Sequence, residues 1–470
     1  MSEHIDFYRN QHVRQRIAEY CGGTGTDTST FTTAPHMVAY GDAGGESSLM
    51  YERFCSDSLD KDSFSWILDN GLDIFRSLWD RDYILGILDV EYYNIDYPGE
   101  IYLNQEKTFS KIEAVYEAIL DTFYAFNIQP LVIMTGQGYH FSFQIKRESR
   151  ASRELEKIGN INSSLYTKYV SAKEWFGREI SAANAQAYDG MGRVMEYVVH
   201  MVIKKACSKS RVPVLCTDLA VGIGETGREG ISLDLSMYGD PIYIRDIRCP
   251  FSTHQKHKVE VSKFGNMVAE EIPIQVSLPR INGSLGDFLE MRRDYSRASA
   301  YAETVSTRIP DVSLSFGRLI KSYKHSRLYQ FHKSFDAIGH DTVRYVLQTH
   351  EKIDMSMLPP CVTHSLLQPN DNLLKPTNMQ VLTRVLLKLG WHPRRIAALI
   401  SSKYEQEQYE WGTIWTLYDA RTRADFYVRL FGGFISAGID REKDLNCVSH
   451  QEKGYCWEPW CGHNLENYKL

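Results

Sequence analysis

Two carboxylates placed two residues apart are the first feature of this sequence that could do chemistry. Asp89 and Glu91 follow a short apolar run, residues 83–88, which is typical of a buried strand. Because side chains alternate along a strand, both acids are expected on one face, ~6.5–7 Å apart along the backbone. Two acids on one face repel each other unless a cation lies between them, and hard oxygen ligands suit Mg²⁺ or Mn²⁺. The alternative interpretation of the pair is a solvated strand end.

A glycine-rich turn follows further along the chain, between two segments that predict strands. The turn consists of Thr135, Gly136, Gln137 and Gly138. Backbone N–H groups in such a turn form an anion-binding nest, and His140, just beyond it, can donate to a phosphate. The alternative interpretation is a hairpin turn with an incidental histidine.

A third carboxylate is followed by a group of basic and hydroxyl side chains. Asp234 closes another apolar strand-like segment, residues 231–233. Within about twenty residues of it come donors suited to a triphosphate or a nucleic-acid backbone, namely Arg248, Ser252, His254 and Lys256. The alternative interpretation is an ordinary basic surface loop.

Taken together, these segments resemble the catalytic domain of the archaeo-eukaryotic primase superfamily. That family shows, in order, a strand ending in Asp-x-Asp or Asp-x-Glu, a Ser-Gly-x-x-Gly-x-His-like turn and a strand ending in Asp. An Arg-x-Pro-x-Ser-x-His-x-Lys-like segment often follows. The counterparts here are residues 89–91, 135–140, 234 and 248–256, with Thr135 at the usual serine and one residue fewer before His140. The resemblance covers about residues 80–260 and implies an α+β fold, with mixed β-sheets flanked by helices in a primase-type catalytic domain.

The resemblance also implies two-metal nucleotidyl transfer from nucleoside triphosphates on a single-stranded DNA template. Asp89, Glu91 and Asp234 would hold two Mg²⁺ or Mn²⁺ ions ~3.5–4 Å apart, at the 3′-hydroxyl and at the triphosphate. The residues implied for nucleotide binding are Thr135, Gly136, Gln137, Gly138, His140, Arg248, Ser252, His254 and Lys256. The alternatives are a catalytically silent nucleic-acid-binding factor and a gap-filling polymerase that does not initiate.

Four of the nine cysteines have a pattern that suggests a second metal site. Cys447, Cys456 and Cys461 fall within 15 residues, and Cys361 precedes two predicted amphipathic helices, residues 377–389 and 393–404. Four thiolates suit either tetrahedral Zn²⁺ or an iron–sulfur cluster. A mixed Cys/His zinc site is the main alternative, because three histidines are close in sequence, His364, His450 and His463.

The cysteine pattern resembles the iron–sulfur domain of the primase large subunit. This resemblance covers about residues 355–465 and implies a [4Fe–4S] cluster in a mainly helical, metal-bound C-terminal domain that helps to start primers. The remaining cysteines are interpreted as ordinary residues, and they are Cys21, Cys55, Cys207, Cys216 and Cys249.

Composition limits the remaining function classes. The chain has 470 residues, 43% of them hydrophobic and 24% charged, with a formal net charge of −6, so any nucleic-acid contact must come from a local basic patch. No apolar stretch approaches the ~20 residues of a membrane span, and residues 1–6 are too polar for a signal peptide. We therefore expect a cytoplasmic protein without a membrane partner. The primase resemblance implies that it works with a separate helicase or with other replication or defence proteins.

Four segments are predicted along the chain. They are a helical lead-in (1–80), a catalytic core (81–265), a helical connecting region (266–355) and the four-cysteine domain (356–470). Within the core, Ser110 and Glu113 form a capping-box pattern that predicts the start of a helix. Ile112, Val115 and Ile119 then recur at helical spacing, which predicts one apolar helix face.

Overall fold

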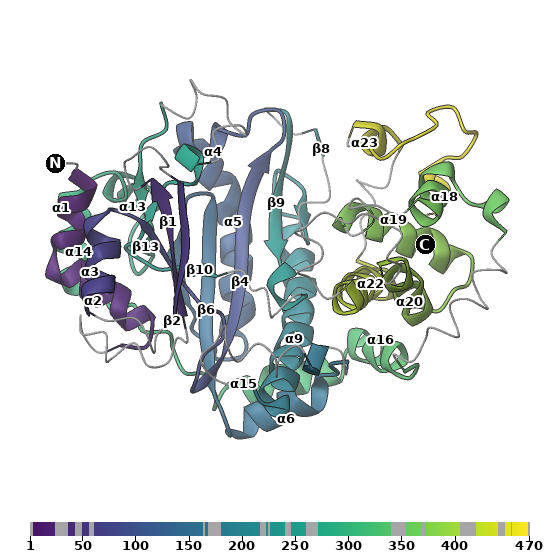
Figure 1. The fold of residues 1–470 in the computed structure, drawn as a ribbon, viewed down its shortest axis with the longest axis horizontal. Coiled ribbons are helices and arrows are strands. Elements are labelled where there is room, and N and C mark those ends of the chain that lie inside the picture. Colours follow the sequence, from purple (N-terminus) through teal and green to yellow (C-terminus); the bar gives the residue numbers. More distant parts are fainter. Residues whose placement is uncertain are drawn as a thin grey trace.

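The structure is a computed structural model. It describes residues 3–23, 36–42, 49–55, 61–162, 165–167, 180–216, 222–223, 226–239, 246–259, 271–339, 354–368, 373, 375–404, 420–439, 447–452 and 454–468. These residues form an α+β fold, with a mixed sheet flanked by helices and a helical C-terminal region (Figure 1). The sequence predicted the fold correctly at this level.

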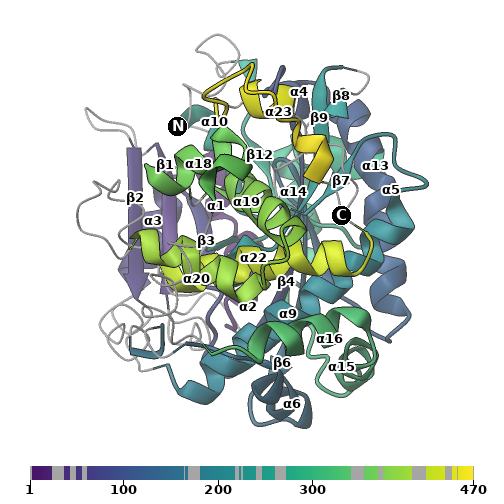
Figure 2. The same cartoon turned by 90° about the vertical axis from the view of Figure 1, so that its right-hand side faces the viewer.

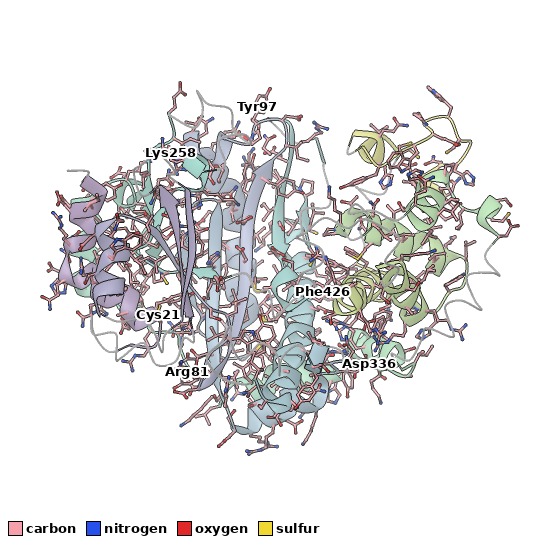
Figure 3. All side chains as sticks on the ribbon, in the orientation of Figure 1. Cys21, Arg81, Tyr97, Lys258, Asp336 and Phe426 are labelled. Carbon is pink, nitrogen blue, oxygen red and sulfur yellow. The ribbon has the colours of Figure 1, made fainter. Side chains whose placement is uncertain are left out.

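The largest sheet carries the predicted carboxylates. Its strand order is β13–β5–β6–β4–β9–β7, with β8 also paired to β9, and the β7–β9 pair is parallel while the other pairs are antiparallel. The strands are β4 (Tyr83–Asn94), β5 (Leu131–Met134), β6 (Gly138–Lys146), β7 (Val214–Leu215), β8 (Gly222–Ile223), β9 (Arg228–Asp234) and β13 (Leu278–Pro279). Arg81 and Tyr97, which flank β4, lie at opposite edges of the molecule, so β4 runs across it (Figure 3).

A second sheet lies on the side of the N-terminal helices (Figure 1). Its order is β10–β3–β1–β2, and a separate two-stranded sheet pairs β11 with β12. The strands are β1 (His36–Asp42), β2 (Leu49–Cys55), β3 (Asp73–Arg76), β10 (Ile247–Arg248), β11 (Thr253–His254) and β12 (Gln275–Val276). Strands β12 and β13 follow the predicted boundary at residue 265 and pair with strands that precede it.

Helices cover the sheets. The N-terminal half contains α1 (Glu3–Arg9), α2 (Gln11–Tyr20), α3 (Lys61–Asp69), α4 (Glu100–Leu103), α5 (Gln105–Tyr124), α6 (Arg150–Ile158) and α9 (Ala182–Ala206). Helix α5 packs on one face of the large sheet, where the rings of Phe109 and Tyr139 meet edge-on with centroids 5.6 Å apart. On the other face, the Tyr20 hydroxyl at the end of α2 lies 3.4 Å from the Ser142 hydroxyl.

Helix α5 begins five residues before the predicted start. Ile112, Val115 and Ile119 are fully buried, which confirms the apolar face. The capping-box prediction is wrong, because Ser110 lies inside the helix, where its hydroxyl donates to the Lys107 carbonyl at 2.7 Å. A serine can make this local bond inside a helix as well as at its first residue, and the sequence pattern does not distinguish the two.

The rest of the chain is mainly helical. Its helices are α10 (Lys256–Val259), α13 (Leu285–Met291), α14 (Tyr295–Thr304), α15 (Phe316–Lys324), α16 (Arg327–Asp336), α18 (Pro360–Leu367), α19 (Pro376–Lys388), α20 (Pro393–Tyr404), α22 (Ala420–Ser436) and α23 (Cys447–Glu452). Helices α19 and α20 confirm the two predicted amphipathic helices, and Gly390 between them has a φ of 84°, as expected of a glycine that ends a helix. Figure 2 shows α18, α19, α20 and α22 in front of the large sheet. Within the described residues, no helix is both long enough and apolar enough to cross a membrane.

Candidate active site

Three predicted site residues lie in one row across three neighbouring strands. Asp89 on β4 is in register with Asp234 on β9 and with His140 on β6. Residues directly opposite in antiparallel pairs point to the same face of the sheet. Nε2 of His140 lies 3.3 Å from Oδ1 of Asp89, and Asp234 accepts a hydrogen bond from the backbone N–H of Ser236 at 2.7 Å. Segments separated by up to 145 positions thus converge on one row.

Glu91 extends this row along β4. It is in register with Gly138 on β6 and with Ser232 on β9, so small residues flank it on both sides. Asp89, Glu91 and Asp234 therefore share one face, on which Asp234 is only 6% exposed. Like charges so placed repel one another at neutral pH, and carboxylate oxygens are the ligands that Mg²⁺ and Mn²⁺ prefer.

This donor set fits a divalent cation chemically. In the described ranges, no three His, Cys, Asp or Glu side chains are already gathered as metal ligands. The carboxylates would close around an ion through side-chain rotation, because the strand register already places them on one face.

The predicted glycine-rich turn joins β5 to β6 and docks on β4. The backbone N–H of Thr135 donates to the Gly138 carbonyl at 2.8 Å, and that of Tyr92 donates to the Gln137 carbonyl at 2.9 Å. A Cβ atom at Gly138 would overlap the carbonyl oxygen of Val90 on β4. Glycine is therefore needed here because two backbones approach closely.

The basic segment after β10 lies against this turn. The His254 ring occupies the space that a Cβ atom of Gly136 would need, and Nζ of Lys256 donates to Oε1 of Gln137 at 3.3 Å. Burial, and then the positive charge of Arg248, lowers the pKa of His254 well below its usual value, so its ring is neutral at pH 7. His254 and Lys256 thus lie beside the turn.

Arg248 and Ser252 make internal contacts instead. Nη1 of Arg248 lies 2.5 Å from Oδ2 of Asp73 on β3, and both side chains are buried. The Ser252 hydroxyl accepts a hydrogen bond from the backbone N–H of Ile74 at 2.7 Å. These contacts hold the basic segment on β3, so the positions favour a supporting role over the direct phosphate contact expected from the sequence. Asp73, whose carboxylate pairs with Arg248, is 175 residues away in the sequence and was not among the predicted site residues.

One residue near the turn carries no motif in the sequence. Nη2 of Arg292, just after α13, donates to the Thr135 carbonyl at 2.6 Å. Arg292 is 157 residues from Thr135 and stands among other charged residues, so spacing and composition give no signal for it.

The four predicted cysteines converge in the C-terminal region. Sγ of Cys447 and Sγ of Cys461 lie 3.9 Å and 4.0 Å from the same carbonyl oxygen, that of His463. Burial, and then the neighbouring Cys456, Cys447 and Cys461, raises the pKa of Cys361 on α18 to about 12. Crowded thiols of this kind become thiolates when they share a cation. Within the described residues, no three of these thiols are already gathered as metal ligands, so the metal site stays a prediction.

The nearby histidines have other contacts. The His364 ring stacks on Trp457 with centroids 3.8 Å apart, and Nδ1 of His463 lies 3.4 Å from the Tyr468 hydroxyl. The His450 ring packs against Tyr455.

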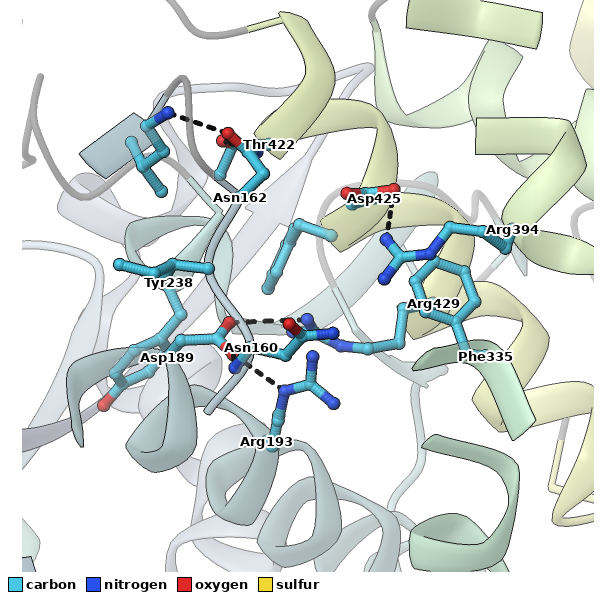
Figure 4. Close-up of a pocket in the computed structure, with 13 residues that line it drawn as sticks. Asn160, Asn162, Asp189, Arg193, Tyr238, Phe335, Arg394, Thr422, Asp425 and Arg429 are labelled. Carbon is cyan, nitrogen blue, oxygen red and sulfur yellow. Dashed lines mark hydrogen bonds and ion pairs between the residues drawn. The ribbon is translucent and has the colours of Figure 1, made fainter. Parts of the chain in front are cut away.

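A buried ion network joins α9 to the C-terminal helices (Figure 4). Arg429 on α22 lies 2.5 Å from Glu196 and 3.4 Å from Asp189, both on α9. Arg193 on α9 lies 2.6 Å from Asp336 at the end of α16. Because α9 also packs on β4, this network links the C-terminal region to the strand that carries Asp89.

Comparisons with family models, curated proteins and solved structures found no match to this chain.

Proposed function

We propose that this protein is a single-chain primase-polymerase. It would transfer nucleotidyl groups from nucleoside triphosphates to a growing primer on single-stranded DNA. The observation that carries the proposal is the row of Asp89, Asp234 and His140, with Glu91 beside it, next to the turn and the basic segment. The resemblance implies two-metal nucleotidyl transfer, a reaction in which carboxylates bind metal ions and basic residues bind phosphates.

The carboxylates have the first task. Asp89, Glu91 and Asp234 would hold two divalent ions, which activate the 3′-hydroxyl and neutralise charge on the triphosphate. The fixed register of β4 and β9 sets the separation of Asp89 from Asp234 before any ligand binds. Such preorganisation supplies most of the rate in phosphoryl transfer, because the transition state needs positioned charge more than covalent help.

The remaining residues bind the nucleotide. His140 would donate to a phosphate oxygen from its place beside Asp89, and Lys256 would add a positive charge from the far side of the turn. Arg248 and Ser252 would hold the basic segment in position through Asp73 and Ile74.

The cysteine region would carry a second cofactor. Cys361, Cys447, Cys456 and Cys461 would ligate a [4Fe–4S] cluster, with Zn²⁺ as the alternative. The family resemblance implies that this region helps to engage the template and the first nucleotide when a primer is started. The ion network at α9 and α22 supports such coupling, since it joins the region to the catalytic fold.

A primer-synthesis assay tests the proposed function. Wild-type protein would be incubated with unprimed and primed single-stranded circles, with ribo- and deoxynucleotides offered separately, in Mg²⁺ or Mn²⁺. We expect product on unprimed circles, its loss in Asp89→Asn, and full activity in Asp82→Asn, which removes an exposed carboxylate at the start of β4. Extension of primed circles alone would favour the gap-filling alternative. No incorporation with either metal would overturn the proposal.

A further inference from the structure

Helices α6 and α15 are rich in basic side chains, although the chain as a whole is negatively charged. The two helices together include six basic and two acidic side chains, against 53 and 59 in the whole chain. The six basic residues, which we call the basic face, are Arg150, Arg153, Lys157, Arg318, Lys321 and Lys324. Because the net charge of the protein gives no general attraction for a polyanion, a local excess of this kind is needed to bind one.

The basic residues lie on the solvent side of each helix. On α6 they occur at positions i, i+3 and i+7, a spacing that places all three on one side of the helix. The other side of α6 is buried through Ala151, Leu155 and Ile158. On α15, Arg318 and Lys321 are exposed, whereas all four apolar side chains of that helix are buried.

The basic sides of the two helices adjoin each other. Both views place α6 and α15 side by side at the same end of the molecule (Figures 1 and 2). Glu154 on α6 lies 2.9 Å from Nζ of Lys157 and 2.5 Å from Nζ of Lys324 on α15. Hydrogen bonds from these lysines lower the pKa of Glu154 to about 2. One carboxylate thus lies between two ammonium groups and can neutralise only one of their charges.

The other cations of the basic face are not neutralised. Arg150, Arg318 and Lys321 are exposed, and their side chains form no ion pair with any residue that the structure describes. Arg153 donates to the Glu148 carbonyl, a neutral group that leaves its charge uncompensated. The second acidic side chain of the two helices, Glu156, is half-buried. The basic face therefore keeps a positive charge that an external anion can share.

The basic face is separate from the carboxylate row. Phe316 of α15 packs on Phe143 of β6, with ring centroids 5.4 Å apart. Because side chains alternate along a strand, Phe143 and His140 lie on opposite faces of the sheet. Strand β6 rises ~20 Å from His140 to Lys146, and α6 begins four residues later. A ligand on the basic face is therefore not a ligand of the proposed metal site.

The composition of the basic face fits a phosphate backbone. Helix α6 contains no aromatic residue, and both rings of α15, Phe316 and Tyr323, are buried. Sites for single-stranded nucleic acid usually add aromatic rings on which bases stack, whereas contact with the phosphates of a duplex needs only cations. Insertion into a membrane surface needs exposed apolar side chains, and neither helix has one.

We propose that the basic face of α6 and α15 binds the phosphate backbone of a nucleic-acid duplex, independently of base sequence. The inference rests on the proposed function for the source of the duplex, which is the primer paired with its template. The electrostatic contact itself does not depend on nucleotidyl transfer and can be tested without it. Such a contact would hold the product on the protein between successive additions.

The test is fluorescence anisotropy of a labelled DNA duplex of about 20 base pairs with the full-length protein, in chelator and without triphosphate. The affinity of the wild type should fall steeply between ~50 and ~200 mM NaCl, because phosphate contacts release counterions. Each lost contact lowers the slope of log K against log salt by ~0.9. The triple variant Arg150→Gln, Arg318→Gln, Lys321→Gln should therefore lower that slope by about 2–3 and weaken binding at least ~10-fold at 0.1 M salt.

A matched control removes the same charge elsewhere. The variant Lys107→Gln, Lys204→Gln, Arg293→Gln replaces three exposed basic side chains on other parts of the fold and should bind the duplex as the wild type does. Both triple variants should melt as the wild type does, because exposed substitutions change stability little. If the variant of the basic face does not fold, Arg318→Gln alone should still lower the slope by ~0.9.

Three results would overturn the inference. The first is a wild type that does not bind the duplex, and the second is an equal salt slope in the wild type and the folded variant of the basic face. The third is a loss of affinity confined to a single strand of the same sequence or to vesicles containing phosphatidylserine, which would assign the basic face to a different partner.

The inference and the proposed function fail in different ways. If the wild type makes primers and the variant of the basic face binds duplex equally well, the duplex site is wrong and the polymerase stands. If no protein incorporates nucleotide but duplex binding depends on the basic face, the polymerase is wrong and the duplex site stands. Both proposals together predict shorter products per binding event in the variant, with an unchanged KM for nucleotide.

Discussion

Asp89 and Asp234 face each other directly across neighbouring antiparallel strands. In such a pair the Cβ atoms lie about 4.5–5.5 Å apart, so the two carboxylates can share a cation but repel each other without one. Asp234 is held by the Ser236 N–H, and Asp89 has the His140 ring on its other side. The backbone register therefore holds the two carboxylates at adjacent positions on one face, as the proposed metal site requires.

The first prediction concerns this repulsion. Asp234→Asn removes one of the two facing charges but keeps the oxygen that accepts from Ser236, so stability without metal should rise, by about 0.2–1 kcal/mol. Mn²⁺ should raise the melting temperature of the wild type and have little effect on the variant. Melting curves in chelator and in Mn²⁺ measure both effects, with Asp82→Asn as the control. If Mn²⁺ raises the melting temperature of the wild type and of Asp234→Asn equally, Asp89 and Asp234 do not share an ion.

The second prediction concerns the turn. Gly138→Ala places a methyl group against the Val90 carbonyl, which must push β6 from β4 and should cost about 1–3 kcal/mol of stability. Nucleotide incorporation should fall as well, because Gly138 is in register with Glu91. Gly317→Ala on α15 is the matched control, since nothing lies within 4 Å of its Cβ position, and it should be neutral or stabilising. Wild-type melting behaviour in Gly138→Ala would refute the close-approach argument.

The sequence indicated which strands carry the carboxylate row, but not which residues surround it. Asp89 and Asp234 could be selected because each ends an apolar strand, and strands are visible as short patterns. The β5–β6 hairpin was predictable from its glycines and alternating residues for the same reason. Features that depend on a few neighbouring residues leave a local signal.

Long-range contacts leave no such signal. The contact of Arg248 with Asp73 and the contact of Arg292 with Thr135 each join residues more than 150 positions apart. In sequence, Arg248 belongs to a motif and Arg292 does not, and only the fold decides which group each guanidinium contacts. Two-residue strands such as β13, which pair across the predicted boundary at 265, are also too short to show a sequence pattern.

The third prediction concerns the cysteines. If Cys361, Cys447, Cys456 and Cys461 ligate a cluster, protein purified without oxygen should be brown and contain iron and acid-labile sulfide. Cys456→Ser should lose the metal and loosen residues 354–468 in hydrogen exchange, while β4, β6 and β9 stay protected, because the site closes a loop of more than eighty residues. Initiation should fall more than primer extension.

Control measurements decide between the metals. Cys207→Ser replaces a cysteine outside the set and should keep the metal. Colourless protein with one tightly bound zinc would reject the cluster and keep the four-ligand site. Protein free of iron and zinc, with all four thiols alkylated in the native state, would reject the site.

The last prediction concerns His200, on the side of α9 that faces the C-terminal helices. Burial lowers the pKa of His200 to about 3, against an ordinary value of about 6.5, and its ring packs on Phe434 of α22 with centroids 4.4 Å apart. The folded protein keeps this ring neutral while the unfolded chain binds a proton below pH 6.5. The contribution of His200 to the free energy of unfolding is therefore fully present above pH 6.5. It decreases as the pH falls towards 3, by up to about 1.4 kcal/mol per pH unit.

Replacing His200 by Gln should reduce that acid dependence. Urea unfolding of wild type and His200→Gln at pH 7.5, 6.5, 5.5 and 5.0 measures it, and the two curves should run parallel above pH 6.5 and converge below it. Acid should weaken the contacts between α9 and α22 first. Hydrogen exchange of the backbone amides near Arg429 can follow this change. Glu196 and Asp189 contribute in the same direction only at lower pH, because their arginine partners outweigh the effect of burial and lower both pKa values to about 2. Identical slopes for the two proteins between pH 6.5 and 5.0 would show that His200 is not the group that titrates.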